Sequence, residues 1–333
     1  KSGSLDFKRS LEEGADVDII GQFGVGFYSA FMVSDTVEVD TKSYTYSEAI
    51  HFTCNENGEY ELTPSDRTER GTSVIMHISE AEKEYLNADK LRAILNKYCS
   101  FMPIDIYFSE VGDCECEHTH EDGCDCEECA NAPINERLPL WCKPASEIST
   151  EEYNAFYHKI FNDFDDPLFS IHINADFPLN FKGILFFPAI NTDYESIEGQ
   201  VKLYYNQVFV SDNIKEVIPE YMFMLKGVLD CPELPLNVSR SYLQTNTYVS
   251  RLSAHIVKKV SDKLNALYNT ERETYEKVWD DIKIFVEYAC MRDKKFYDRV
   301  KDALLMKLTD GSYVTVKEYL EVARETNENT VYY

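Results

Sequence analysis

The chain has 333 residues, 44% of them hydrophobic, and its 59 acidic and 33 basic side chains give a formal net charge of −26. This length and composition are typical of a globular protein with two or three domains. So acidic a surface repels the phosphates of nucleic acids, and we expect no nucleic-acid partner. No apolar run approaches the roughly 18 residues of a membrane span, and we expect no membrane partner. No signal peptide is visible, and because the first residue is Lys1 we expect the natural protein to begin further upstream.

Residues 1–110 are predicted to form a mixed α/β region. Amphipathic periodicity and a terminal glycine indicate helices, whereas runs of β-branched and aromatic residues between polar turns indicate strands. In chain order, these patterns predict a short helix at 4–15, strands at 36–44, 44–52 and 71–79, a helical region at 80–101 and a strand at 102–108.

Residues 111–135 lack hydrophobic periodicity and are predicted to be a linker, with eight acidic residues and no lysine or arginine. The linker also holds seven candidate metal ligands within sixteen residues: Cys114, Cys116, His118, His120, Cys124, Cys126 and Cys129. Thiolates and imidazoles suit zinc, which takes four such ligands, so this density favours a Zn²⁺ site over an acidic spacer with incidental cysteines. A redox-sensing cluster is the alternative. Clustered rather than dispersed cysteines indicate a reducing compartment, and we expect a cytoplasmic protein.

Residues 136–333 return to foldable patterns. Ser149 and Glu152 form a capping box that predicts a helix at 150–161. Strict alternation over 169–177 predicts a strand with one apolar face, made of Phe169, Ile171, Ile173, Ala175 and Phe177. After it the patterns predict strands at 181–188 and 201–210, helices at 251–268, 275–290 and 294–308, a turn at Asp310-Gly311, and a last helix capped by Thr315 and Glu318.

The glycine-rich stretch "IGQFGVGFYSAF", residues 20–31, is the first candidate for chemistry. Its G-x-x-G-x-G spacing matches neither the Rossmann nor the Walker pattern. Glycines let backbone N–H groups approach an anion, and a following helix would offer its positive N-terminus. By itself, however, the pattern favours a hinge beside a core helix over a phosphate cradle.

The stretch "LPLNVSRSYLQ", residues 234–244, is the second candidate. A proline-constrained loop runs into a helix that places Arg240 and Gln244 on one face. An arginine in such a place can stabilise charge on a transferring phosphate. Taken alone, this stretch favours a simpler interpretation, in which Arg240 is a surface residue whose aliphatic part packs against the protein.

Taken together, these stretches resemble the ninety-kilodalton heat-shock chaperone family, in particular its bacterial type. The similarity covers nearly the whole chain apart from the acidic linker, and it rests on several motifs in one order: "KSGSLDFKRSLEEGADVDIIGQFGVGFYSAFMV", "ERGTSVIMHIS", "LPLWCKPASEISTEEYNAFYHKIFNDFDDPL", "FKGILFFP" and "KGVLDCPELPLNVSRSYLQ". The resemblance implies an α/β fold in three parts. These are a partial GHKL-type α/β sandwich at 1–110, which is the end of an ATPase domain, the linker at 111–135, and a middle domain at 136–333. The middle domain would have α-β-α layers over about 136–248, then a helical part and a small α/β end over about 249–333.

The resemblance also implies a function, an ATP-dependent chaperone that assists protein folding as a homodimer and binds unfolded or partly folded clients. The residues implied to contact ATP are Lys1, Ser2, Gly21, Gln22, Phe23, Gly24, Val25, Gly26 and Phe27 in the lid segment, and Thr72 near the adenine. Arg240 is implied to reach the γ-phosphate, with Asn237 and Gln244 in the same catalytic loop. Trp141 matches an aromatic implicated in client contact, although a buried core tryptophan is an equal alternative.

Some of the family's parts are expected to lie outside these 333 residues. The general-base glutamate, the Mg²⁺-holding asparagine and the adenine-reading aspartate would precede Lys1, and the dimerisation domain would follow Tyr333. We therefore expect an ATPase in the intact protein and no ATPase activity from this fragment alone. The alternatives are a non-hydrolysing holdase, a metal-responsive scaffold, or another GHKL ATPase such as a type II topoisomerase subunit, which the acidic charge disfavours.

Overall fold

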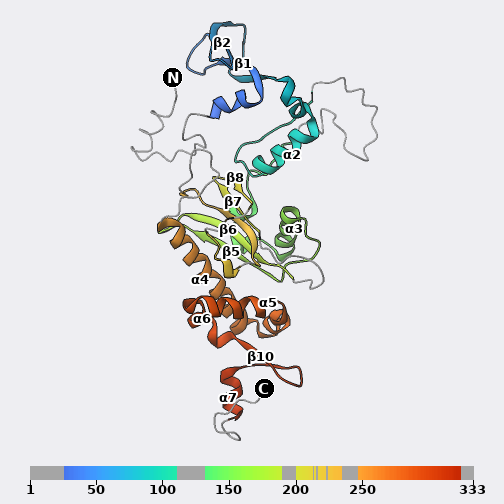
Figure 1. The fold of residues 1–333 in the computed structure, drawn as a ribbon, viewed down its shortest axis with the longest axis vertical. Coiled ribbons are helices and arrows are strands. Elements are labelled where there is room, and N and C mark those ends of the chain that lie inside the picture. The colour runs from blue at the N-terminus through green and yellow to red at the C-terminus, as the bar shows by residue number, and fades with distance from the viewer. Residues whose placement is uncertain are drawn as a thin grey trace, which may run out of the picture. The chain divides into compact units, whose positions relative to one another are not determined.

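The computed structural model describes residues 26–110, 132–189, 200–234 apart from 213, 215, 216 and 223, and 247–323. The chain divides into two compact units, which are described separately. The first unit consists of residues 1–100 and 105–135, and the second consists of residues 101–104 and 136–333. Figure 1 shows the helices and strands of both. The helix expected at 4–15 lies outside the described residues.

The first unit is built on a four-stranded antiparallel sheet in the order β3-β2-β1-β4. Its strands are β1 (Ser34–Lys42), β2 (Ala49–Asn55), β3 (Tyr60–Ser65) and β4 (Gly71–Ile78). The short 3₁₀ helix η1 (Gly26–Met32) precedes the sheet, and η2 (Glu80–Leu86) and α2 (Ala88–Cys99) follow it. The predicted helical region at 80–101 is therefore two helices, because the side chain of Asn87 accepts a hydrogen bond from the Lys90 N–H at 2.9 Å and starts α2 there.

Two details of the first unit differ from the sequence prediction. Strand β3 was not predicted, and it forms because its backbone pairs with β2 across a turn at Gly58, whose φ is +81°. The strand predicted at 102–108 is wrong. No strand is formed over these residues. The Ile106 N–H instead donates to the Asn135 side chain at 2.8 Å, and the Ile106 carbonyl accepts from the Ile134 N–H at 2.8 Å.

The second unit is built on a five-stranded sheet in the order β5-β6-β9-β7-β8, in which only β7 and β9 run parallel. Its strands are β5 (Phe169–Ala175), β6 (Phe181–Phe187), β7 (Val201–Tyr205), β8 (Val208–Ser211) and β9 (Lys226–Asp230). The alternation predicted for β5 is confirmed, since Ile171, Ile173 and Ala175 are buried. Phe177 departs from it, because the strand ends at Ala175 and the Phe177 side chain is 93% exposed.

Helices pack against both faces of this second sheet, as Figure 1 shows for α3 and α4. One face carries Phe186 and Tyr204 and is covered by α3 (Thr150–Phe161) and by the short helix η3 (Leu140–Cys142). The other face packs against α4 (Thr247–Thr270) and α5 (Arg272–Arg292), followed by α6 (Lys294–Val300). The short helices η4 (Ala145–Glu147) and η5 (Glu220–Met222) lie in connections.

The last described part of the second unit is a short hairpin followed by a helix. After η6 (Lys301–Ala303), strands β10 (Leu305–Lys307) and β11 (Tyr313–Thr315) pair around Gly311, whose φ of +88° confirms the predicted turn. The helix predicted to reach 308 is wrong beyond Val300, because residues 305–307 pair with β11 instead. The cap of α7 (Val316–Ala323) is confirmed: the N–H of Thr315 donates to Glu318 at 2.6 Å and the N–H of Glu318 donates to Thr315 at 3.2 Å.

The capping box of α3 provides a first testable prediction. The Ser149 hydroxyl accepts from the Glu152 N–H at 3.2 Å, and the Glu152 carboxylate accepts from the Ser149 N–H at 2.9 Å. Ser149→Ala is expected to lower the free energy of unfolding of the second unit by about 1 kcal/mol, because one helix-terminal donor loses its partner. Urea unfolding followed by tryptophan fluorescence measures this. Ser149→Asp should stay close to wild type, and equal losses in both variants would contradict the capping explanation.

Candidate functional site

The glycine-rich segment enters the described structure at its end, in η1. Neither the backbone at Gly26 nor its packing against the described residues requires a glycine, since its φ is not in the left-handed region and a Cβ would meet none of their atoms within 4 Å. The ring of Phe27 packs edge-on against Phe52 of β2, with ring centroids 6.1 Å apart. Lys1, Ser2, Gly21, Gln22, Phe23, Gly24 and Val25 lie outside the described residues.

Thr72 lies on the same face of the first sheet as Phe52, the residue against which Phe27 packs. In the strand register, Val39 pairs with Phe52 of β2 and with Val74 of β4, and Thr41 pairs with Thr72 of β4. Paired residues point to the same face of a sheet, as does every second residue along a strand, so Phe52 and Thr72 lie on one face. The hydroxyls of Thr41 and Thr72 are 2.7 Å apart on this exposed surface. The structure therefore brings two of the predicted nucleotide residues, Phe27 and Thr72, to one side of the sheet.

The opposite face of that sheet carries a polar network that the sequence analysis missed. The carboxylate of Glu38 lies between two imidazoles, 2.7 Å from His77 Nε2 and 3.5 Å from His51 Nε2. Asp40 lies 3.7 Å from His51 Nδ1 and 3.8 Å from the Arg67 guanidinium. The sequence does show acidic residues at alternate positions of β1, Glu38 and Asp40. This pattern predicts that one face of the strand is polar, but it does not predict which residues of the neighbouring strands contact that face.

The predicted catalytic loop is anchored at both ends in the second unit. Asn237, Arg240 and Gln244 lie outside the described residues, between β9 and α4. Before the loop, the Cys231 N–H donates to the Tyr204 carbonyl at 3.0 Å and Leu234 is buried. After it, the Tyr248 hydroxyl donates to the Asn180 carbonyl at 3.2 Å. The segment that holds Arg240 therefore begins and ends on the packed sheet-and-helix core.

Asp230, the last residue of β9, is a buried carboxylate next to that loop. One carboxylate oxygen accepts hydrogen bonds from Trp141 Nε1 at 3.2 Å and from the Gln207 N–H at 3.1 Å. The other oxygen has no hydrogen-bond partner among the described residues. Burial raises the pKa of Asp230, and the hydrogen bonds from Gln207 and Trp141 and the charge of Lys182 oppose that rise.

Trp141 is part of the core and is not an exposed client contact. Its side chain is 1% exposed, and it lies in an aromatic cluster with Phe101, Phe156 and Tyr204, with centroids 4.7, 5.9 and 5.0 Å away. The alternative of a buried core tryptophan is therefore the correct one. Edge-to-face aromatic packing and the indole hydrogen bond to Asp230 together explain why a tryptophan fits here.

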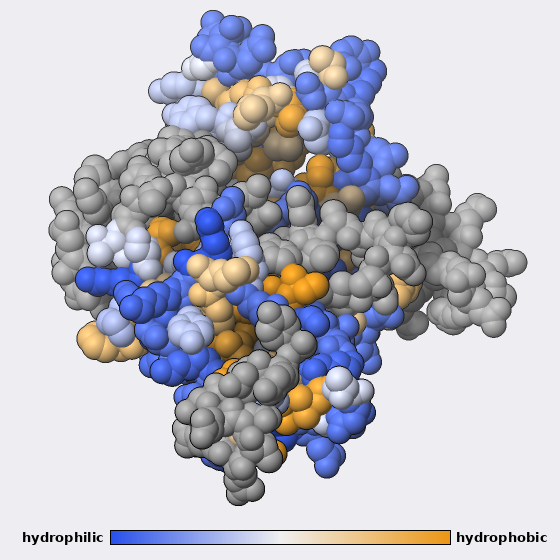
Figure 2. Space-filling view, turned by 60° about the horizontal axis from the view of Figure 1, so that its bottom comes forward, coloured by the Kyte–Doolittle hydropathy of each residue, from blue (hydrophilic) through white to orange (hydrophobic). Residues whose placement is uncertain are grey.

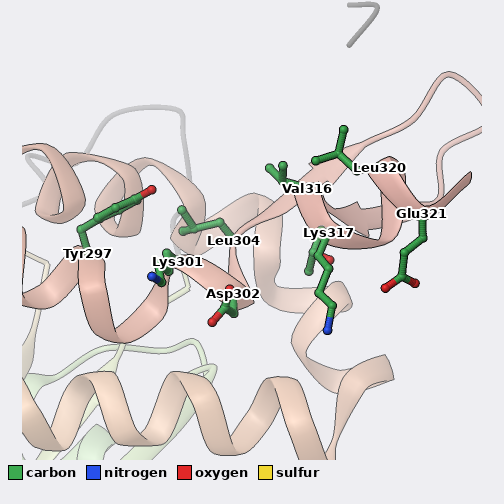
Figure 3. Close-up of a pocket in the computed structure, with 9 residues that line it drawn as sticks. Tyr297, Lys301, Asp302, Leu304, Val316, Lys317, Leu320 and Glu321 are labelled. Atoms are coloured by element: carbon green, nitrogen blue, oxygen red, sulfur yellow. The ribbon is translucent and has the colours of Figure 1, made fainter. Parts of the chain in front are cut away.

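One cavity of about 390 Å³ lies near the chain end of the second unit, drawn in Figure 3. Tyr297, Lys301, Asp302 and Leu304 line one side, and Val316, Lys317, Leu320 and Glu321 line the other, which belongs to α7. Its rim carries two cations and two anions, so the charges select no class of ligand, and no predicted site residue lies in it. We assign it no binding role.

The predicted linker ligands Cys114, Cys116, His118, His120, Cys124, Cys126 and Cys129 all lie outside the described residues. Among the residues that are described, no group of three or more histidine, cysteine or acidic side chains is arranged to hold a metal ion. In the same part of the chain, no helix is both long enough and apolar enough to cross a membrane.

Comparisons with known proteins give a consistent result. The family described as "Hsp90 protein" matches residues 125–333. The chain is 39% identical over 336 residues to "Chaperone protein htpG" of Bacteroides fragilis strain YCH46, which covers 99% of this chain and 48% of that relative. It is 41% identical over 305 residues to "Chaperone protein HtpG" of Porphyromonas gingivalis strain ATCC 33277, a match that covers 90% of this chain and 43% of that relative. It is 31% identical over 340 residues to "Chaperone protein HtpG" of Fusobacterium nucleatum, a match that covers 98% of this chain and 52% of that relative. The chain thus spans about half the length of the curated relatives it matches.

Proposed function

The chain belongs to the Hsp90 family, and from this premise we propose that it is part of an ATP-dependent molecular chaperone. The observation that carries the proposal is the family match over 125–333 together with relatives named as chaperones along 90–99% of the chain. The whole protein would use ATP with Mg²⁺, bind unfolded or partly folded clients, and act as a cytoplasmic homodimer. Residues 1–110 would complete its GHKL-type ATPase domain, and 136–333 would form its middle domain after the linker.

The nucleotide would be held by the first unit. Backbone N–H groups of 21–27 are proposed to bind the phosphates, with Lys1 and Ser2 at the start of the same lid segment and Thr72 near the adenine. Support comes from Phe27 and Thr72, which lie on one face of the sheet. The bound Mg²⁺ would neutralise phosphate charge.

Catalysis would depend on the loop between β9 and α4. Arg240 is proposed to place its guanidinium on the γ-phosphate, with Asn237 and Gln244 in support, so that charge on the transferring group is stabilised. The described residues on either side of this segment, Cys231 and Tyr248, are hydrogen-bonded to Tyr204 and Asn180 of the second unit, which is consistent with this role. We propose hydrolysis for the whole protein and expect none from these 333 residues alone.

The proposal is tested by dilution of a chemically unfolded enzyme into buffer with or without the chaperone. The 333-residue chain is expected to slow aggregation, measured by light scattering, and the whole protein is expected to hydrolyse ATP as well. A chain without any effect on aggregation would overturn client binding by this part. Suppression by a whole protein that does not hydrolyse ATP would identify a holdase instead.

Zinc in the linker is a separate proposal with its own prediction. Protein purified without chelator is expected to contain about one or two Zn²⁺ per chain, bound mainly by Cys114, Cys116, Cys124, Cys126 and Cys129, with His118 or His120 as further ligands. Metal should be lost at acidic pH, because thiolates and neutral imidazoles are the ligands. Elemental analysis before and after chelation decides between this and the spacer interpretation. Metal-free protein with freely reactive linker thiols would leave only the spacer.

A further inference from the structure

The elements β10, β11 and α7, residues 305–323, form an end module that buries little apolar surface. Leu305 and Ala323 are the only buried apolar side chains in this fully described range, whereas α4 and α5 each bury a whole face in the core. The cavity of about 390 Å³ lies between α7 and the residues of α6 and η6 that line its other side, as Figure 3 shows. Apolar burial therefore contributes little to holding the module closed.

Polar side chains from α5 reach this module. Arg272 and Asp280 are separated by about two helical turns, so both can contact a structure that lies beside the helix. Exposed apolar residues mark no comparable contact area, since they appear in several separate places among hydrophilic ones on the face drawn in Figure 2. The charged contacts of α5 are therefore the specific feature of this part of the second unit.

Arg272 makes the larger of the two contacts. Its two terminal nitrogens each lie 3.3 Å from one carboxylate oxygen of Glu318 in α7, which is the geometry of a bidentate pair. One of these nitrogens also donates to the Tyr313 carbonyl of β11 at 3.3 Å. Its Nε pairs with Glu276 at 2.6 Å, and the guanidinium lies 4.7 Å from the centroid of the Tyr268 ring in α4. One side chain therefore joins the helices to both β11 and α7.

Asp280 makes the second contact, with the hairpin. Its Oδ2 accepts a hydrogen bond from Lys307 Nζ of β10 at 2.6 Å and another from the Tyr313 hydroxyl of β11 at 2.7 Å. One carboxylate thus holds both strands of the hairpin to α5. The side chains of Lys307 and Asp280 are 51% and 47% exposed, so water and salt ions reach this pair.

We propose that the end module opens from the helices as one unit while the rest of the second unit stays folded, and that the ion pairs of Arg272 and Asp280 form a latch that keeps it closed. The inference goes beyond the proposed function, because it depends only on contacts within the second unit. Opening exchanges partly exposed polar contacts for water, which costs less free energy than exposing the core around α4 and α5. Salt weakens such contacts, so ionic strength sets how often the module opens.

Hydrogen exchange of the 333-residue chain, followed by mass spectrometry, measures this opening. Raising NaCl from about 0.05 M to about 0.5 M is expected to speed exchange of residues 305–323 about threefold and to leave α4 and α5 unchanged, because salt screens the two pairs. Arg272→Gln is expected to speed exchange of the module about tenfold at low salt, since it removes the bidentate pair. Arg272→Lys should recover part of the protection, because it keeps the charge and loses the fork.

Two further variants serve as controls. Lys159→Gln removes another exposed ion pair of the second unit, between Lys159 of α3 and Glu136 at 3.2 Å, which does not involve the module. Its module should exchange like that of wild type. A double variant, Arg272→Gln with Asp280→Asn, lacks both pairs of the latch, so exchange of its module should no longer respond to salt.

Four outcomes would overturn the inference. They are equal exchange of the module in wild type and Arg272→Gln, acceleration of the module by Lys159→Gln to the same extent, a salt response that persists in the double variant, and exchange of the module at the same rate as the core of α4 and α5. The salt series on the wild-type chain requires no substitution, so the latch can be tested even if a variant fails to fold.

Discussion

Replacement of Arg240 by alanine is expected to lower kcat for ATP hydrolysis by the whole protein about tenfold to a thousandfold, with little change in ATP affinity. A guanidinium is permanently charged and planar, so it can contact two phosphate oxygens at once. If it contacts the γ-phosphate only during transfer, it contributes little to the binding of ATP itself. Its effect then falls on the transition state and not on the bound ground state. Steady-state kinetics together with calorimetric ATP titration measures both quantities.

Two further variants sharpen this prediction. Arg240→Lys should recover only part of kcat, because an ammonium group keeps the charge and loses the forked geometry. Gln244→Ala should cost less than Arg240→Ala, since a neutral amide stabilises a charged transition state less. If Arg240 only packs on the surface, Arg240→Ala would lower the melting temperature and leave kcat, measured well below that temperature, unchanged. That result would remove the reason to regard the loop as catalytic.

Features that depend on neighbouring residues in the chain could be predicted from sequence. The capping boxes at Ser149 and Thr315 and the turn at Gly311 are local, since each is completed within about four residues. The alternation in β5 was equally legible, because one face of the strand is buried against helices. The same pattern wrongly placed Phe177 on the buried face, because periodicity predicts which face of a strand a residue lies on but not where the strand ends.

Features that depend on distant partners could not be predicted. Residues 305–307 look helical in isolation and become a strand because β11 pairs with them. Strand β3 contains a proline and a glutamate, which are disfavoured in strands, yet it forms because its backbone hydrogen-bonds to β2. On the face of the first sheet opposite the candidate nucleotide residues, the Glu38 network joins three strands, and no spacing in the sequence shows that His51 and His77 meet one carboxylate. Motifs predicted the nucleotide and loop residues, which stay predictions, whereas the burial of Trp141 could be recognised only from the packing around it.

Loss of the Trp141 side chain is expected to destabilise the second unit strongly. Trp141→Ala should lower the free energy of unfolding by about 3–5 kcal/mol, because it opens a cavity among Phe101, Phe156 and Tyr204. It also removes a hydrogen bond from the buried carboxylate of Asp230. Both tryptophans of the chain, Trp141 and Trp279, lie in the second unit, so fluorescence during urea unfolding reports on that unit even when Trp141 is absent.

The hydrogen bond and the packing can be separated by pH. Trp141→Phe keeps most of the ring and loses the indole N–H, so it should cost less than Trp141→Ala, about 1–2 kcal/mol at neutral pH. Burial already raises the pKa of Asp230, and the indole hydrogen bond opposes that rise. Without it the folded-state pKa rises further, so the native state holds a proton to higher pH than the unfolded state does. Stability from a raised carboxyl pKa is present below the unfolded pKa and lost as pH rises through the folded pKa. The deficit of Trp141→Phe relative to wild type should therefore shrink as the pH falls below the pKa of Asp230. A deficit that is the same at acidic and neutral pH would mean that Trp141 acts through packing alone.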